Sequence, residues 1–170
     1  RYMDSVGATI NRSVYGAAQD AGLVTLRLRE RLARLFSFPE KPTHAILTPG
    51  ATAGLNFILK GFLHPGDHCI VSAMEHNAVM RPLLQLSGVE FDRIPCDAEG
   101  KFDPADLLPL IRPNTRLCIL AHGSNVCGTV QDAAAVGAIC AQHGIAFALD
   151  AAQTAGHIPI DFQALSLSAL

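Results

Sequence analysis

The chain has 170 residues, of which 49% are hydrophobic and 16% charged, and its formal net charge is −2 at pH 7. This composition predicts one compact domain with a sizeable core. Trp is absent, no basic run occurs and aromatic residues are few, so nucleic-acid binding is not expected. The apolar stretches are shorter than the ~20 residues of a membrane span, and no signal-peptide pattern opens the chain, so we expect a cytoplasmic protein with no membrane partner.

The first predicted element is a long amphipathic helix in "SVYGAAQDAGLVTLRLRERLARLF", from Ser13 to Phe36, where apolar residues recur at helical spacing. "SFPEKP" breaks this pattern, and "THAILT" (43–48) then predicts a short strand. Next, "PGATAGLNFILKGFL" predicts a glycine-rich turn that opens a helix, which "HPGDH" ends.

The rest of the chain alternates between strand and helix patterns. Strands are expected in "CIVSA" (69–73), "VEFDRIP" (89–95), "TRLCILAH" (115–122) and "IAFALD" (145–150), and helices in "NAVMRPLLQLSG" (77–88), "DPADLLPLIR" (103–112) and "DAAAVGAICAQHG" (132–144). Such alternation predicts an α/β fold, a three-layer sandwich whose mostly parallel sheet is covered by helices on both faces.

Four polar segments are expected at the carboxyl ends of the strands, where sheets of this class bind ligands. They are "TPGATAGLN", "AMEHNA", "AHGSNVCGT" and "DAAQTAGH". Within the first, Gly50, Ala51 and Thr52 could leave backbone N–H groups free for a phosphate at a helix start. The alternative is an ordinary capped turn, since the segment is neither a P-loop nor a Gly-x-Gly-x-x-Gly motif.

The other three segments each contribute a polar side chain with a structural alternative. His76 alone is more typical of a solvated loop or a helix cap than of a functional site. Asn125 could simply form a turn with the neighbouring glycine. Asp150 directly follows a buried strand, where it could cap the next turn or fix a cationic heterocycle.

The five cysteines are an odd number without Cys-x-x-Cys spacing, which predicts neither a disulfide framework nor a metal site. They are Cys69, Cys96, Cys118, Cys127 and Cys140. Most lie in apolar runs, so we expect them to be small buried hydrophobic residues.

Taken together, the motifs resemble the class V aminotransferases, which include cysteine desulfurases and selenocysteine lyases and belong to the fold-type I enzymes that use pyridoxal 5'-phosphate (PLP). The resemblance extends over "NRSVYGAA", "TPGATAGLNFI", "GDHCIVSAMEHNA", "GKFDPADL", "LAHGSNVCGT" and "ALDAAQTAGHIPIDF". It implies that residues 1–170 form part of the large, PLP-binding domain. It also implies that Gly50, Ala51 and Thr52 bind the cofactor phosphate, and that His76 stacks on the pyridine ring and relays protons.

The resemblance gives the remaining three site residues roles around the same ring. Asn125 would lie near the cofactor hydroxyl and the substrate carboxylate, and Gln153 would bond the ring's 3-oxygen. Asp150 would pair with the pyridinium nitrogen. A carboxylate within ~4–6 Å favours the protonated nitrogen, and that proton deepens the electron sink, so His76 and Asp150 are the predicted catalytic residues.

The family's Schiff-base lysine lies a few tens of residues beyond this aspartate in a Ser-x-His-Lys-like segment. Lys41, Lys60 and Lys101 are the only lysines of the sequence, and none has that context. Cys127 likewise does not match the reactive cysteine of desulfurases. We therefore expect a chain truncated before the lysine, without the small C-terminal domain and inactive by itself.

Within the family the sequence is most like a cysteine desulfurase, which converts L-cysteine to L-alanine and passes sulfur to an enzyme cysteine. An aminotransferase or a selenocysteine lyase is the alternative, because the residues that discriminate them lie outside the sequence. The resemblance implies a homodimer, a cysteine-like substrate and a possible sulfur-acceptor protein. A non-catalytic or nucleotide-binding α/β domain would share the periodicity but has no reason to combine His76, Asn125, Asp150 and Gln153.

Overall fold

The structure is a computed structural model that describes residues 7, 8, 10, 15–38 and 42–170. The chain forms two compact units, Arg1–Leu47 and Thr48–Leu170. All of the predicted site residues belong to the second unit. No helix in the described part of the chain has the length and apolar character needed to cross a membrane.

The first unit contains the long helix α2 (Gly16–Leu35) and the short 3-10 helix η1 (Pro42–His44). The predicted helix is confirmed from Gly16 onward, whereas Ser13 and Val14 lie outside the described residues. The strand predicted in "THAILT" is wrong, because its start belongs to η1 and residues 45–48 have no regular structure. A strand requires a neighbour to pair with. Among the described residues, no strand pairs with this segment.

The second unit is built on a parallel sheet of four strands in the order β2-β1-β3-β4. Its strands are β1 (His68–Ser72), β2 (Glu90–Ile94), β3 (Thr115–Ala121) and β4 (Ala146–Asp150). All four were predicted from the sequence. Because the strands are parallel, the ends of β1, β3 and β4 lie at the same edge of the sheet.

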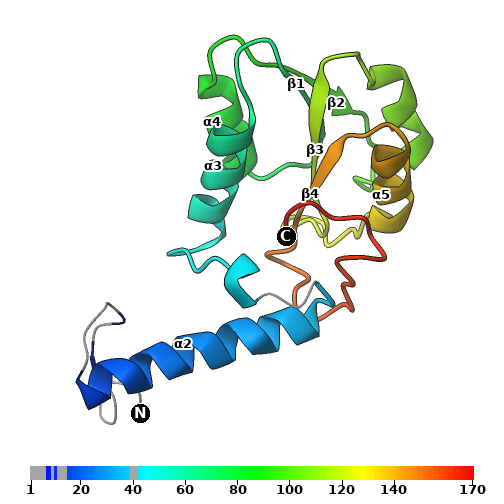
Figure 1. The fold of residues 1–170 in the computed structure, drawn as a ribbon. Helices are drawn as coiled ribbons and strands as arrows, with labels where there is room; N and C mark the ends of the chain where they lie inside the picture. Colours follow the sequence, from blue (N-terminus) through cyan, green and yellow to red (C-terminus); the bar gives the residue numbers. More distant parts are fainter. Residues whose placement is uncertain (1–6, 9, 11–14, 39–41) are drawn as a thin grey trace. The chain divides into compact units, whose positions relative to one another are not determined.

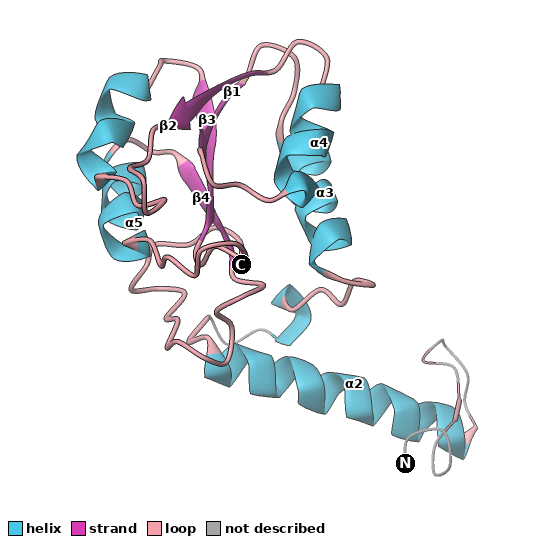
Figure 2. Ribbon diagram, turned by 180° about the vertical axis from the view of Figure 1, so that it is seen from behind, coloured by secondary structure: helices cyan, strands magenta, loops and turns pink. Residues whose placement is uncertain are grey.

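Helices cover both faces of this sheet, as Figures 1 and 2 show from opposite sides. Helices α3 (Ala51–Phe62) and α4 (Asn77–Gln85) lie on one face, and the 3-10 helix η2 (Pro104–Leu110) and helix α5 (Ala133–Gln142) lie on the other. The predicted three-layer α/β fold is therefore confirmed. Apolar side chains of α3, α4 and the sheet form the core on the first face, among them the fully buried Leu59, Val79 and Ile119.

The α-helix predicted in "DPADLLPLIR" is wrong, because residues 104–110 form a 3-10 helix. Pro109 removes one backbone donor from the segment, although Pro82 at the corresponding position of α4 is accommodated in an α-helix. Asp103 caps it by accepting the Ala105 N–H at 2.9 Å.

Candidate functional site

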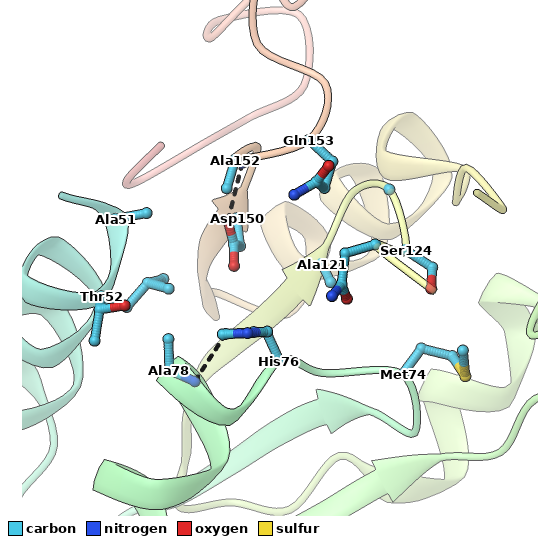
Figure 3. A pocket seen from close by; sticks show the side chains of 13 residues that line it. Ala51, Thr52, Met74, His76, Ala78, Ala121, Ser124, Asp150, Ala152 and Gln153 are labelled. Carbon is cyan, nitrogen blue, oxygen red and sulfur yellow. Dashed lines mark hydrogen bonds between the residues drawn. The ribbon is translucent and has the colours of Figure 1, made fainter. Parts of the chain in front are cut away.

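A cavity lies at the carboxyl edge of the sheet, between the start of α3, the β1–α4 turn, the β3–α5 loop and the end of β4 (Figure 3). Six of the seven predicted site residues line it: Ala51, Thr52, His76, Asn125, Asp150 and Gln153. The seventh, Gly50, is the N-cap residue of α3 and directly precedes Ala51. Four segments that are far apart in sequence are thus brought together by the parallel topology.

The start of α3 presents free backbone donors. Gly50 has extended backbone geometry, no side chain caps the helix, and its first turn has no acidic residue. The N–H of Ala53 bonds to the Gly50 carbonyl at 3.1 Å. The N–H groups of Ala51 and Thr52 have no partner among the described residues, so the positive end of the helix dipole and two donors can face an anion.

His76 is the N-cap residue of α4, and its Nδ1 accepts the Ala78 N–H at 3.1 Å. The capping role considered from the sequence is therefore real. It uses one ring atom, and it places the proton of the neutral imidazole on Nε2, because Nδ1 must keep its lone pair to accept. Nε2 and the ring faces stay available on the cavity side of the turn (Figure 3).

Asp150 ends β4 and is half-buried. Its Oδ1 accepts the Ala152 N–H at 3.0 Å, and its backbone carbonyl accepts the His122 N–H at 3.0 Å. One carboxylate oxygen thus holds the following turn. In Figure 3 the carboxyl group faces the cavity across from Thr52 and His76, so its negative charge is offered to a ligand.

Asn125 and Gln153 are exposed, and their side chains make no hydrogen bond within the described part of the chain. Turn formation around Asn125 falls instead to Ser124, whose hydroxyl accepts the N–H groups of Val126 and Cys127 at 3.2 and 3.3 Å. Two amide side chains that line the cavity without serving the fold can therefore donate to, and accept from, a ligand.

The sequence reasoning did not identify Glu75, which lies next to His76. Its Oε1 accepts the Ser72 hydroxyl at 2.5 Å and the Ala121 N–H at 2.8 Å. Its Oε2 is buried without a partner. Burial raises the pKa of this carboxyl to about 7. The signal in the sequence was an acid three residues beyond a fully buried strand, in "CIVSAME".

His122 and Thr154, a buried pair next to Gln153, were also not identified from the sequence. His122 and Thr154 are both buried, and His122 Nδ1 lies 2.8 Å from the Thr154 hydroxyl. Burial lowers the pKa of His122, which favours the neutral ring. Gly123 packs against this pair so closely that an added Cβ would lie 2.8 Å from Thr154 Cγ2.

Cysteine burial agrees in part with the prediction from the sequence. Cys69, Cys118 and Cys140 are buried, whereas Cys96 is half-buried and Cys127 is exposed. Hydrogen bonds with Ser124 and Thr129 lower the pKa of the Cys127 thiol to about 7. Across the described ranges, no cluster of His, Cys, Asp and Glu could hold a metal ion.

Neither of the described lysines lines the cavity. Lys60 lies in the last turn of α3, nine residues or roughly 13 Å along the helix from Ala51. Lys101 lines a separate hollow beside Asp97 and Asp103. Lys41 lies outside the described residues.

Comparisons with known proteins agree with this architecture. The aminotransferase class-V family model matches residues 1–169. The cysteine desulfurase IscS of Photobacterium profundum is 37% identical over 145 residues, which are 82% of this chain and 35% of that protein. This chain spans about a third of the length of such curated relatives.

Solved structures of two enzymes superimpose on nearly the whole chain. A cysteine desulfurase from Thermococcus onnurineus has a TM-score of 0.85 at 25% identity and covers 98% of this chain and 42% of its own. The cysteine desulfurase CsdA of Escherichia coli has a TM-score of 0.79 at 29% identity and covers 98% and 43%. Sequence and fold thus lead to one assignment, that the chain belongs to the class V aminotransferase family.

Proposed function

We propose that this chain supplies the PLP-binding part of a class V enzyme, and that the enzyme is a cysteine desulfurase acting on L-cysteine. The observation that carries the cofactor proposal is the joint lining of one cavity by Thr52, His76, Asn125, Asp150 and Gln153. The substrate proposal is supported by the relatives, which are cysteine desulfurases.

The groups around the cavity match the chemistry of PLP. The free N–H groups at the start of α3 and the Thr52 hydroxyl suit a phosphate dianion, while the Asp150 carboxylate suits a protonated ring nitrogen. The His76 ring can lie against an aromatic face, and Gln153 and Asn125 offer amide donors. When bound, PLP supplies an electron sink for carbanion chemistry at the substrate's α-carbon.

Asp150 and His76 would then have separate roles toward the bound cofactor. Asp150 would keep the proton on the ring nitrogen, because an opposite charge at close range stabilises the protonated form. His76 would orient the ring and hold a transferable proton at Nε2, with Nδ1 fixed by Ala78. The lysine that binds the cofactor aldehyde would be neither Lys60 nor Lys101, given where these two lie.

Several further parts of the proposal rest on the family. Residues 1–170 would be part of the large domain, the protein would act as a cytoplasmic homodimer, and a sulfur-acceptor protein would be its partner. In the class V family these properties accompany desulfurase activity, and here they stay predictions.

Asp150→Asn tests the function, because asparagine keeps the Oδ1 acceptor for the Ala152 N–H and removes only the charge. We expect an unchanged melting temperature, weaker PLP binding by absorbance titration, and loss of most L-alanine formation from L-cysteine in the enzyme that contains this chain. Asp106→Asn, on the exposed surface of η2, is the matched control. Near-normal PLP affinity and turnover in Asp150→Asn would contradict the assignment.

A further inference from the structure

Glu75 lies in the turn between β1 and α4, and its carboxyl group extends toward the end of β3. Its Oε1 lies 2.5 Å from the Ser72 hydroxyl and 2.8 Å from the backbone nitrogen of Ala121, the last residue of β3. Glu75 thus connects a residue that precedes His76 in the chain with a residue that lines the cavity from another strand.

The position of the Ala121 N–H explains why a side chain is needed there. The pairing of β1 with β3 ends at Val71 and Ile119. The segment that follows β1 then turns away from β3, and its Ala73 N–H donates to the Ile94 carbonyl of β2 at 3.0 Å. Ala121 lies two residues beyond Ile119, so its N–H has no β1 backbone carbonyl to meet. The Glu75 carboxyl replaces that carbonyl and extends the ladder by one bond.

The surroundings of the carboxyl group indicate which protonation state is favoured. Oε2 is buried and has no partner among the described residues. The titratable groups that face Glu75 are Asp150 at the end of β4, Cys69 of β1 and Cys118 of β3, and His76 is its neighbour in sequence. None of them offers a cation as a fixed partner there. The two hydrogen bonds to Oε1 favour the ionised form, but an ionised carboxylate would be a buried charge without a counter-ion and would repel Asp150, and burial is the larger effect.

We propose that Glu75 is a positioning residue of this site, whose neutral carboxyl fixes both the turn that carries His76 and the end of β3 that leads to Asn125. The role of the positioned residues toward PLP rests on the function proposed above. The positioning itself does not require a ligand.

The pH dependence follows from burial, which raises the pKa of Glu75 to about 7. A carboxyl whose folded-state pKa is raised contributes stability at low pH, and this contribution is lost as the pH rises from its unfolded value of about 4.5 through about 7. At pH 8 the carboxylate is ionised in the folded protein, so an opening of the turn that returns this charge to water costs less free energy than at low pH.

Amide hydrogen exchange tests the proposal without a ligand. The N–H of Ala121 reports the Glu75 bond directly, and the N–H of Ala78 reports the place of His76, whose Nδ1 accepts it. Wild type should lose protection at both amides by roughly tenfold between pH 6 and pH 8. Glu75→Gln, which is neutral and keeps the acceptor, should stay protected at both pH values. Glu75→Ala should be unprotected at both, and Glu99→Gln, at an exposed acid, should follow wild type.

PLP affinity, measured well below the melting temperature, separates positioning from general stability. We expect Glu75→Ala to bind PLP roughly tenfold more weakly, with Glu75→Gln restoring wild-type affinity. The proposal would be overturned if amide protection fell with pH equally in wild type and in Glu75→Gln. It would also be overturned if the Ala78 amide were equally protected in Glu75→Ala and Glu75→Gln. If Glu75→Ala does not fold, the wild-type and Gln curves decide. If the wild-type protein binds no PLP, the proposed function is wrong, but the hydrogen-exchange data still test the positioning role of Glu75.

Discussion

Gly123→Ala should displace the loop that carries Gln153. The added Cβ would lie 2.8 Å from Thr154 Cγ2, whereas ordinary contact begins at 3.4 Å, so the two groups must separate by about 0.6 Å. Thr154 cannot rotate freely, because it is buried and its hydroxyl lies 2.8 Å from His122 Nδ1. The loop must therefore move, or the buried hydrogen bond must break.

Either outcome destabilises the second unit by ~1–3 kcal/mol, the range for overpacking or for a lost buried hydrogen bond. With a urea dependence of ~1–3 kcal/mol/M, the unfolding midpoint should fall by roughly 1 M. PLP affinity should fall as well, because Gln153 directly precedes Thr154 in the loop that the clash displaces. Urea unfolding and PLP titration measure the two effects.

A second substitution shows whether the methyl contact is the cause. Thr154→Ser removes Cγ2 and keeps the hydroxyl beside His122, so adding it to Gly123→Ala should recover most of the lost midpoint. Gly61→Ala in α3, where an added Cβ meets nothing within 4 Å, should leave the midpoint unchanged or raise it. A wild-type midpoint in Gly123→Ala, or no recovery in the double variant, would refute the steric argument.

Two further predictions concern titratable groups outside the cavity. Burial, followed by the charge of Arg112, lowers the pKa of the fully buried His68, so its contribution to the free energy of unfolding should be lost as the pH falls through about 6.5. His68→Gln should flatten that decline in urea unfolding between pH 7.5 and 5.5, whereas His64→Gln, at an exposed histidine, should not; equal slopes would refute the assignment. Cys127, whose thiol pKa is lowered to about 7, should react with iodoacetamide before Cys96 at pH 7.5, as peptide mass mapping can follow. Ser124→Ala should slow Cys127 and leave Cys96 unchanged, and an unaltered ratio of the two rates would contradict the hydrogen-bond origin of the shift.

The elements that were predicted correctly are those whose pattern is local. Three of the four strands contain short apolar runs bounded by turns, β2 carries charged residues between its apolar ones, and helices alternate with the strands along the chain. "THAILT" has the same apolar character, but a strand also needs a partner, and partners are not visible in a single segment. In residues 103–112 the apolar spacing suggested an α-helix, yet residues 104–110 form a 3-10 helix, and Pro82 within α4 shows that a proline alone does not decide between the two.

In the candidate site, the residues that line the cavity could be predicted from local motifs, whereas the contacts that support them could not. His76, Asn125, Asp150 and Gln153 could be placed at one edge because their motifs follow parallel strands. Gly50, Ala51 and Thr52 follow no strand in the described part of the chain, and it was the glycine-rich helix start that placed them. The supporting contacts could not be predicted, since Glu75 bonds to a residue 46 positions away and His122 to one 32 positions away. Both pairs form only once β1, β3 and the turn after β4 are packed. Side chains that hold a site are therefore harder to read from sequence than those that line it.

From the sequence, His76 and Asp150 were each interpreted as either a backbone cap or a ligand-binding side chain. The geometry makes the two interpretations compatible. Each side chain carries two polar atoms. Nδ1 of His76 and Oδ1 of Asp150 hold backbone N–H groups at 3.1 and 3.0 Å, which fixes both side chains at the cavity. Nε2 and Oδ2 keep their capacity for a ligand. Because fixed groups lose little freedom on binding, capping is compatible with the roles proposed for these two side chains and does not compete with them.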